Sequence, residues 1–325
     1  VREAGYDYAL TTQRGVARSD TPLYEVPRFT PWGPGNLRMA LQLTRNLREP
    51  ARLALPAHEP KRKALMVAFH FPPQAGSSGI LRTLNFVKYL PRSGWQPIVL
   101  SAHPRAYVEC REDLLKSIPA GTQVERAQAL DAAKHLSIKG KYPGWLALPD
   151  RWASWWPGAV ATGMKIIREQ KPDVIWSTYP IATAHLIGAS LAERSGLPWI
   201  ADFRDPMING DYPSAPLQRR VWQRLEARVI RKATRCVFTT ERAALVYRER
   251  YPEHAGKCLV IENGYDEEAF EGNTPNRMGV ADDKLLLLHS GIIYPRDRDP
   301  SAFFRAVAQL IEDGVLDKDR LCIRF

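Results

Sequence analysis

The sequence has few cysteines, and none of them belongs to a recognisable motif. Its 325 residues include only Cys110, Cys236, Cys258 and Cys322. They form no CxxC pair and no cluster with histidine, which argues against a zinc site and against a disulfide framework. We therefore expect reduced thiols in a cytoplasmic protein.

The sequence also lacks a signal peptide and a clear membrane-spanning run. The first residues alternate charges with turn formers and contain no apolar core. One window, 174–192, is free of formal charge over a length that spans a bilayer, yet it is interrupted by polar residues and a proline. We interpret it as a buried strand, a turn and a helix.

Two nucleotide-binding motifs are absent as well. No GxGxxG follows a strand, and no Walker A loop is present, so a nicotinamide-dependent oxidoreductase is disfavoured. What is abundant is positive charge, because 46 Lys and Arg against 35 Asp and Glu give a net charge of +11. This favours an anionic partner such as a nucleotide sugar, a membrane leaflet or a nucleic acid, without choosing among them.

Residues 1–60 are a basic leader rich in proline and arginine. It contains one predicted helix, Asn36–Arg48, with leucines near one face and arginines elsewhere. Docking of this helix onto the following domain and contact with an anionic membrane surface both remain open.

From Lys63 onward, apolar runs of strand length alternate with amphipathic segments of helix length. This pattern predicts an α/β domain over residues 61–270, a Rossmann-like parallel sheet with helices on both faces. The expected strands are Ala64–Phe69, Gln96–Ser101, Gln123–Arg126, Asp173–Ser177, Pro198–Phe203, Arg235–Thr239 and Cys258–Glu262, and the expected helices are Ile80–Leu90, Val160–Glu169, Ala182–Arg194 and Leu217–Lys232.

A polar stretch at 271–283 is predicted to be a linker, after which residues 284–325 begin a second Rossmann-like domain. Here we expect a strand at Leu285–His289, a helix at Ser301–Glu312 and a strand at Leu321–Phe325. So short a unit does not close a core, so we expect these residues to be part of a larger, truncated domain.

Ligands bind at the carboxyl ends of strands in open parallel sheets, which directs attention to the residues after each strand. The first candidate loop contains Gly76, Ser77, Ser78 and Gly79, with Arg82 one helical turn later. Glycines allow close backbone approach, and free N–H groups at a helix start attract phosphate. An ordinary flexible turn is the alternative.

Two further candidates follow strands. Asp202, Arg204 and Asp205 gather just before a proline and are hard to explain as core, although a structural Asp–Arg pair explains them equally well. Gly291, Arg296 and Arg298 precede a helix, and arginine offers forked donors to phosphate oxygens. A solvated basic loop is the competing interpretation there.

A fourth candidate is a tryptophan-rich segment that includes Trp152. Indole rings stack on the apolar faces of sugars, but packing is the commoner role of such clusters.

In order and spacing, these motifs resemble a bacterial family 4 glycosyltransferase over nearly everything from Lys61 onward. The residues that carry the resemblance are Ala64–Phe69, Phe71–Pro73, Gly76–Gly79 with Arg82, Gly94–Pro97, Lys171–Ile175, Gly196–Pro206, Glu262–Asp266 and Gly291–Pro300.

The resemblance implies a GT-B fold, with the acceptor mainly on the first domain and the nucleotide sugar mainly on the second. It implies retention of anomeric configuration, with no essential metal and no cofactor beyond the nucleotide-sugar co-substrate. Gly76, Ser77, Ser78, Gly79, Gly291, Arg296 and Arg298 would face the donor phosphates, Arg82 and Trp152 the acceptor, and Asp202, Arg204 and Asp205 the reaction itself. Arg204 stands where many relatives carry a histidine.

We therefore predict a transferase of bacterial cell-surface polysaccharide or glycolipid synthesis, cytoplasmic or peripheral on the inner face of the membrane. Its expected partners are a nucleotide diphosphate sugar, a glycan or lipid-linked acceptor and an anionic membrane surface, with no nucleic acid. The family's donor-binding glutamate pair would follow Phe325, so we expect this stretch alone to be inactive. A non-catalytic binding module is the alternative.

Overall fold

The computed structural model describes residues 62–77, 79–266, 279–281, 283–289, 293 and 299–324. The chain divides into two compact units, of which one is Pro50–Asp266 and the other holds Glu267–Phe325. The predicted leader with its helix at 36–48, and most of the predicted linker at 271–283, lie outside the described residues.

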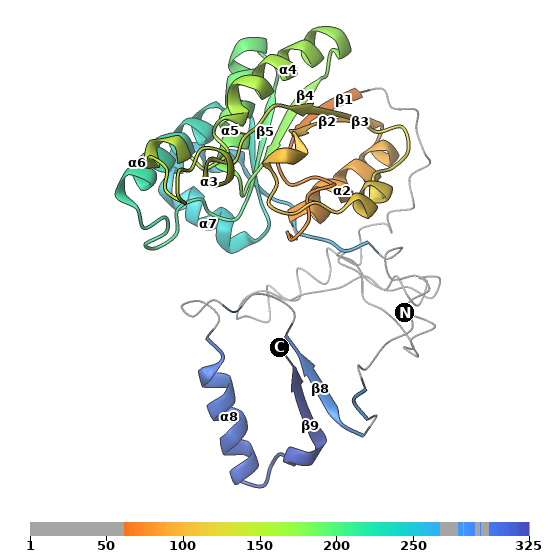
Figure 1. Ribbon diagram of the computed structural model, residues 1–325, viewed down its shortest axis with the longest axis vertical. Helices are drawn as coiled ribbons and strands as arrows, with labels where there is room; N and C mark the ends of the chain where they lie inside the picture. Colours follow the sequence, from red (N-terminus) through yellow and green to blue (C-terminus); the bar gives the residue numbers. More distant parts are fainter. Residues whose placement is uncertain are drawn as a thin grey trace, which may run out of the picture. The chain divides into compact units, whose positions relative to one another are not determined.

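The larger unit is built on a seven-stranded sheet in which every pairing is parallel. The strand order is β3-β2-β1-β4-β5-β6-β7, so the chain runs outward from β1 to one edge and then from β4 to the other (Figure 1). The strands are β1 Arg62–Val67, β2 Trp95–Ala102, β3 Gln123–Ala127, β4 Val174–Thr178, β5 Trp199–Arg204, β6 Arg235–Phe238 and β7 Cys258–Val260. All seven predicted strands are present, which confirms the predicted fold class.

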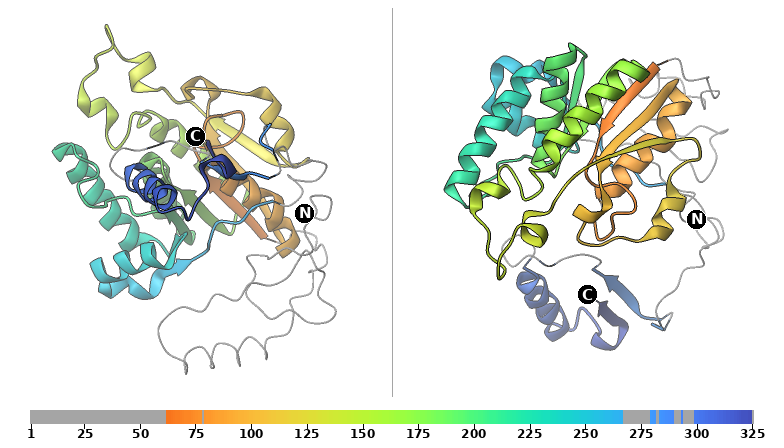
Figure 2. Two further views of the ribbon diagram at one scale, coloured as in Figure 1. Left: turned by 90° about the horizontal axis from the view of Figure 1, so that it is seen from below. Right: turned by 45° about the horizontal axis from the view of Figure 1, so that its top comes forward.

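Six α-helices connect these strands (Figure 2). They are α2 Gly79–Tyr89, α3 Ala132–His135, α4 Trp155–Gln170, α5 Ala182–Ser195, α6 Pro216–Lys232 and α7 Glu241–Arg250. Short 3-10 turns add η2 Leu90–Ser93, η3 Pro104–Ala106, η4 Glu112–Ser117, η5 Gly144–Ala147 and η6 Pro252–Lys257. Helix α7 was not predicted, and α4 begins five residues before its predicted start.

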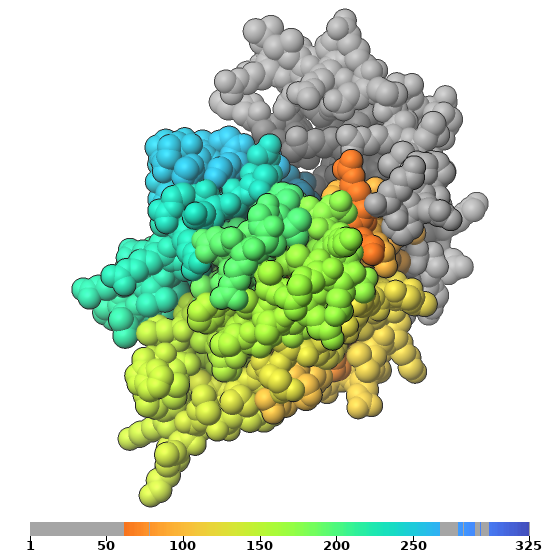
Figure 3. Space-filling view, turned by 90° about the horizontal axis from the view of Figure 1, so that it is seen from above, coloured from red at the N-terminus to blue at the C-terminus, as the bar shows by residue number. Residues whose placement is uncertain are grey.

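Side-chain alternation along the strands divides the core into two layers. Leu65 and Val67 of β1 belong to the larger apolar cluster, which lies between the sheet and helices α4 to α7. Ala64 and Met66 belong to the smaller cluster, which α2 covers on the opposite face. Figure 3 shows α4, α5 and α6 packed next to one another across the first of these faces. Helices therefore cover both faces of the sheet, as predicted.

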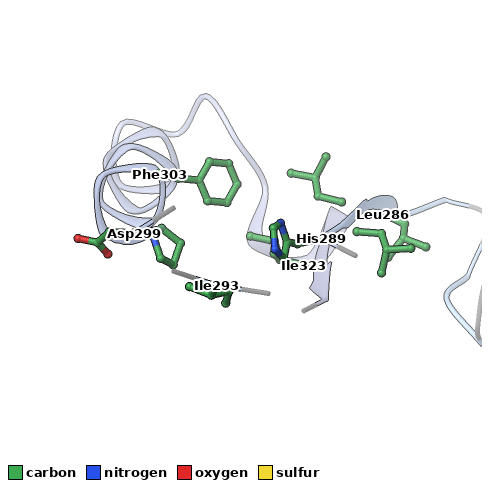
Figure 4. Close-up of a pocket in the computed structure, with 9 residues that line it drawn as sticks. Leu286, His289, Ile293, Asp299, Phe303 and Ile323 are labelled. Carbon is green, nitrogen blue, oxygen red and sulfur yellow. The ribbon is translucent and has the colours of Figure 1, made fainter. Parts of the chain in front are cut away.

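The second unit is a parallel βαβ motif in the residues described. Strands β8 Leu285–Leu288 and β9 Leu321–Arg324 pair in register, and helix α8 Ser301–Glu312 connects them. These elements match the sequence prediction to within one residue at each end. An apolar hollow of about 490 Å³ lies between strands and helix (Figure 4), lined by Leu286, Leu287, Leu288, His289, Ile293, Asp299, Pro300, Phe303 and Ile323.

Helix α5 approaches β4 and β5 closely at Gly188. A Cβ atom there would lie 2.7 Å from Ser177 Oγ and 2.7 Å from Trp199 Nε1. These two atoms are themselves hydrogen-bonded at 2.9 Å, and the Ser177 hydroxyl also contacts His185 Nδ1 at 2.8 Å. Glycine at this position therefore lets the helix rest on a buried polar network.

We expect Gly188→Ala to lower the free energy of unfolding by about 1–3 kcal/mol, because overpacking outweighs the gain of up to about 1 kcal/mol in helix propensity. Urea denaturation measures this. Gly256→Ala is the matched control, since a Cβ there meets nothing within 4 Å. Equal stability of the Gly188→Ala variant and the parent would contradict the close approach of α5.

Candidate functional site

The candidate site lies where the strand order reverses, at the carboxyl ends of β1, β4 and β5. In open α/β sheets this switch point forms the binding crevice. The loop after β1 is braced by the segment after β2: Ala75 N donates to Glu109 O at 3.0 Å, and Arg111 N donates to Pro73 O at 2.8 Å. The first candidate loop is therefore a supported structure rather than an ordinary flexible turn.

Four residues converge at the start of α2. Ser77 Oγ lies 3.2 Å from His70 Nδ1 and accepts a hydrogen bond from Gly79 N at 3.1 Å. A Cβ on Gly79 would lie 2.5 Å from His70 Nδ1 and 3.1 Å from Arg204 Nη1. Only glycine leaves room for these side chains to meet. We call His70, Ser77, Gly79 and Arg204 the switch-point cluster.

Arg204 reaches this cluster through an unusual backbone. The pairing of β5 with β6 shifts register between Asp202 and Arg204, and Arg204 has φ 63°, the left-handed conformation. Thr239 holds it there, because its N–H and its hydroxyl both donate to Arg204 O at 2.9 Å. For a residue other than glycine such a conformation costs about 1–3 kcal/mol and is typical of functional positions.

The guanidinium of Arg204 is a partly buried charge that has no counter-ion among the residues that the structure describes. Within the described part of the chain it forms no ion pair, and Nη1 donates only to Tyr179 O, at 3.3 Å. Burial and the neighbouring Arg82 lower its pKa, although Asp202 and Asp205 act in the opposite direction. An anion placed against this guanidinium would relieve the cost of its desolvation.

His70 contributes hydrogen bonding without charge. Burial, and then the proximity of Arg204, lower the pKa of His70 to about 4. The imidazole is therefore neutral at neutral pH, and Arg204 supplies the charge of the switch-point cluster. His70 is the first residue after the first predicted strand and begins the first candidate loop, but no role was predicted for it.

Asp202, predicted to take part in the reaction, and Arg82, predicted to bind the acceptor, are paired with each other. Arg82 Nε and Nη2 donate to the two carboxylate oxygens of Asp202 at 3.0 and 2.9 Å, and Thr178 Oγ1 donates to the same carboxylate at 2.8 Å. The Arg82 side chain is 6% exposed and that of Asp202 is 0% exposed. An Asp–Arg pair is therefore present, but it joins Asp202 to Arg82 and not to Arg204.

Asp205 remains available at the same loop. It is exposed, and its Oδ1 accepts only a long contact from Thr239 Oγ1, at 3.5 Å, within the described residues. The chain just beyond it is fixed, because Met207 N donates to Tyr247 Oη at 3.0 Å and Arg250 Nη2 donates to Ile208 O at 3.0 Å.

Gly76 lies at an acidic spot in the first candidate loop. Its φ of 75° requires glycine, and a Cβ would lie 3.0 Å from Glu109 Oε2. A carboxylate so close disfavours a phosphate beside Gly76, which places the better anion position at Ser77 and Gly79. Ser78 lies outside the described residues.

Trp152 packs against the core. Its indole Nε1 donates to Ala106 O at 3.1 Å, and its ring lies 4.7 Å from that of Phe69. Arg151 covers the ring at 4.6 Å. These contacts favour the packing interpretation over the predicted contact with an acceptor.

The predicted phosphate residues of the second unit, Gly291, Arg296 and Arg298, lie outside the described residues. Their neighbours His289, Ile293 and Asp299 line the apolar hollow of that unit (Figure 4). Among the described residues, no group of three or more His, Cys, Asp or Glu is placed to hold a metal ion.

We expect Arg82→Ala to reduce the free energy of unfolding by about 3–5 kcal/mol, because it leaves the Asp202 carboxylate buried without a counter-ion. Thermal and urea unfolding of the two proteins measure the loss. Arg111→Ala removes an Asp113 pair whose side chains are 60% and 55% exposed, and it should leave the midpoint unchanged. Similar losses in both variants would contradict this assignment.

We also expect stability to fall as the pH drops from about 6.5 to about 4. Burial lowers the pKa of His185 to about 3, and burial together with Arg204 lowers the pKa of His70 to about 4. As the pH falls, both histidines are therefore protonated in the unfolded chain before they are protonated in the folded one, which favours unfolding. Each histidine contributes up to about 1.4 kcal/mol per pH unit. His70→Gln should make the free energy of unfolding depend less steeply on pH and leave only the contribution of His185. An unchanged slope, measured by urea denaturation at several pH values, would rule out a buried neutral His70.

Comparison with known proteins gives one family match by sequence. Residues 79–264, more than half of the chain, match the family described as "Glycosyl transferase 4-like domain". No curated protein matches the chain. No helix in the described part of the chain has both the length and the hydrophobicity that a membrane span requires.

Solved structures give more distant similarities. The chain is 13% identical to sucrose-phosphate synthase from Thermosynechococcus elongatus, covering 81% of this chain and 70% of that one with a TM-score of 0.49. It is 14% identical to Anabaena HepE in complex with UDP (80% and 68% covered, TM-score 0.45) and 17% identical to S. aureus MnaA with UDP (80% and 60% covered, TM-score 0.43).

These similarities lie below 25% identity and below a TM-score of 0.5, so the assignment rests on the sequence match. That match begins at Gly79 of the switch-point cluster. It ends at residue 264, just past Glu262, whose carbonyl oxygen accepts a hydrogen bond from Arg82 Nη1. The chain belongs to the glycosyl transferase 4-like domain family.

Proposed function

We propose that this protein transfers a sugar from a nucleotide diphosphate sugar to a hydroxyl group of a glycan or lipid-linked acceptor, with retention of configuration. The observation that carries the proposal is the state of Arg204. Its backbone is held in the strained left-handed conformation, and its guanidinium lies near Ser77 and the first turn of α2 without a counter-ion in the described residues. Family membership supplies the reaction class.

The chemistry requires stabilisation of a leaving group. As the bond from the anomeric carbon to the diphosphate breaks, negative charge develops on the diphosphate, and a fixed cation in a dehydrated site stabilises that charge. Arg204 supplies a forked donor, and Ser77 and the N–H groups at the start of α2 supply further donors. We also propose that Arg296 and Arg298 bind the donor diphosphate and that the reaction needs no essential metal ion.

Other residues would position the acceptor hydroxyl. The acceptor oxygen bonds to the anomeric carbon on the face from which the diphosphate leaves, and its proton passes to an oxygen of the departing diphosphate. We propose that the exposed Asp205 carboxylate orients that hydroxyl, since Asp202 is occupied by Arg82 and Thr178. Neutral His70 can exchange hydrogen bonds there without adding charge. We further propose that the acceptor belongs to bacterial cell-surface synthesis at the inner face of the membrane.

The experiment is release of nucleoside diphosphate by the full-length protein from a panel of nucleotide sugars, with glycan and lipid-linked acceptors and with EDTA present. We expect release that depends on an acceptor and a product of unchanged anomeric configuration. Binding of nucleotide sugar without any release would instead establish a binding module, and absence of both would overturn the proposal.

Arg204→Gly separates function from folding. Glycine accepts the left-handed backbone, so we expect the free energy of unfolding to stay within about 1 kcal/mol of the parent. Loss of a charge-stabilising donor should lower kcat by about 10²–10³-fold. Arg204→Lys keeps the positive charge but loses the forked pair of donors, so its kcat should lie between those of the parent and Arg204→Gly.

Arg228→Ala is the matched control, because that arginine on α6 pairs with Glu193 on α5, at side-chain exposures of 33% and 34%, and contacts no residue of the switch-point cluster in the described part of the chain. It should turn over normally. Normal turnover by Arg204→Gly as well would show that Arg204 does not bind the diphosphate.

A further inference from the structure

The chain makes a long excursion between β3 and α4, over residues 128–154, that stands out from the folded unit (Figures 2 and 3, yellow-green). At its tip Ile138 and Lys141 exchange two backbone hydrogen bonds, at 2.8 and 3.1 Å. Lys139 and Gly140 between them both have left-handed φ values, 50° and 75°. This is the backbone of a tight two-residue hairpin turn, so the tip is an ordered element.

The base of the excursion is closed by contacts between its two ends and is tied to helix α5. Ser154 Oγ donates to Leu130 O and accepts from Leu130 N, each at 2.9 Å, and Arg151 pairs with Asp131 at 2.9 Å. Asp150 accepts from Thr183 N at 2.7 Å and Thr183 Oγ1 at 2.9 Å, which fixes it to the first turn of α5. The hairpin is therefore presented on a rigid support.

The tip exposes large apolar side chains where a surface loop would ordinarily carry polar ones. Ile138 is 80% exposed, Trp145 is 68% exposed and Leu136 is 36% exposed, all within ten residues. Single exposed apolar residues are common, but a cluster of them marks an interaction surface.

The same tip is basic. Lys134, Lys139 and Lys141 are exposed, and in the part of the chain that the structure describes none of them forms an ion pair. No aspartate or glutamate occurs anywhere in residues 132–149. An exposed tryptophan and isoleucine beside lysines without ion pairs in the described residues suit a lipid interface. Apolar and indole side chains enter the boundary between headgroups and acyl chains, and the lysine ammonium groups reach the lipid phosphates.

We propose that residues 134–145 form a docking surface for an anionic phospholipid bilayer. Ile138 and Trp145 enter the headgroup boundary, and the three lysines contact lipid phosphates. The excursion leaves the carboxyl edge of the sheet, the edge that carries the switch-point cluster, so docking brings this edge to the membrane surface. The surface belongs to a different part of the sequence from the leader helix predicted at 36–48, and its binding to lipid does not depend on the reaction proposed for Arg204.

The test is sedimentation of the full chain with vesicles of phosphatidylcholine alone and with vesicles that also contain phosphatidylglycerol. We expect binding to the anionic vesicles only, weakened by salt. Lys139→Gln with Lys141→Gln should weaken it about 30-fold, and Ile138→Ser with Trp145→Ser at least 10-fold. These residues are exposed, so circular dichroism and the midpoint of thermal unfolding should match the parent.

Leu217→Ser is the matched control, because Leu217 on α6 is 57% exposed and lies outside the tip. It should bind like the parent, and so should a variant without residues 36–48. The proposal would be overturned if the protein bound both kinds of vesicle equally or bound neither. It would also be overturned if either double variant bound as well as the parent, or if binding were lost only when residues 36–48 were removed.

Discussion

The buried ion pair of Arg82 and Asp202 is the contact on which the candidate site of the larger unit depends. A carboxylate with no exposure in the centre of a sheet needs a partner of opposite charge, and Arg82 supplies it from the opposite side of the strand-order reversal. The same guanidinium reaches Glu262 O at 3.3 Å and Asn263 Oδ1 at 3.0 Å, beyond β7. One side chain thus ties α2 to β5 and to the chain leaving the last strand.

This pairing also determines the chemistry of its neighbours. Because both oxygens of Asp202 are engaged by Arg82, the nearby Arg204 is left without that carboxylate. Arg204 is then held through its carbonyl oxygen by the N–H and the hydroxyl of Thr239, in a backbone conformation that its own residue type disfavours. Strain of this kind is maintained by the surrounding structure, here Thr239 and the register shift between β5 and β6.

The sequence predicts most of the strands well because they are short apolar runs of the kind that a two-sided buried sheet requires. The edge strand β3 is the exception, since it contains Glu125 and Arg126 and only Ala127 is buried. Helix α7 was missed because Glu and Arg dominate it and only Ala243, Ala244 and Tyr247 are buried. The predicted helix began at Val160 and left out the first turn of α4, which contains Pro157, a residue that a helix tolerates at this position. The loops of the site were found, but the partner of each arginine was not, since Arg82 and Asp202 lie 120 positions apart.

Gly79 has a consequence for how such a site can change over evolutionary time. The imidazole of His70 and the guanidinium of Arg204 both occupy the space that a side chain at position 79 would need. A Cβ at position 79 would lie 2.5 Å from His70 and 3.1 Å from Arg204, so a larger residue there first requires a smaller or displaced residue at position 70. Positions 70 and 79 are therefore sterically coupled and should vary together, so that homologues with a smaller residue at position 70 tolerate a larger residue at position 79 than this protein does.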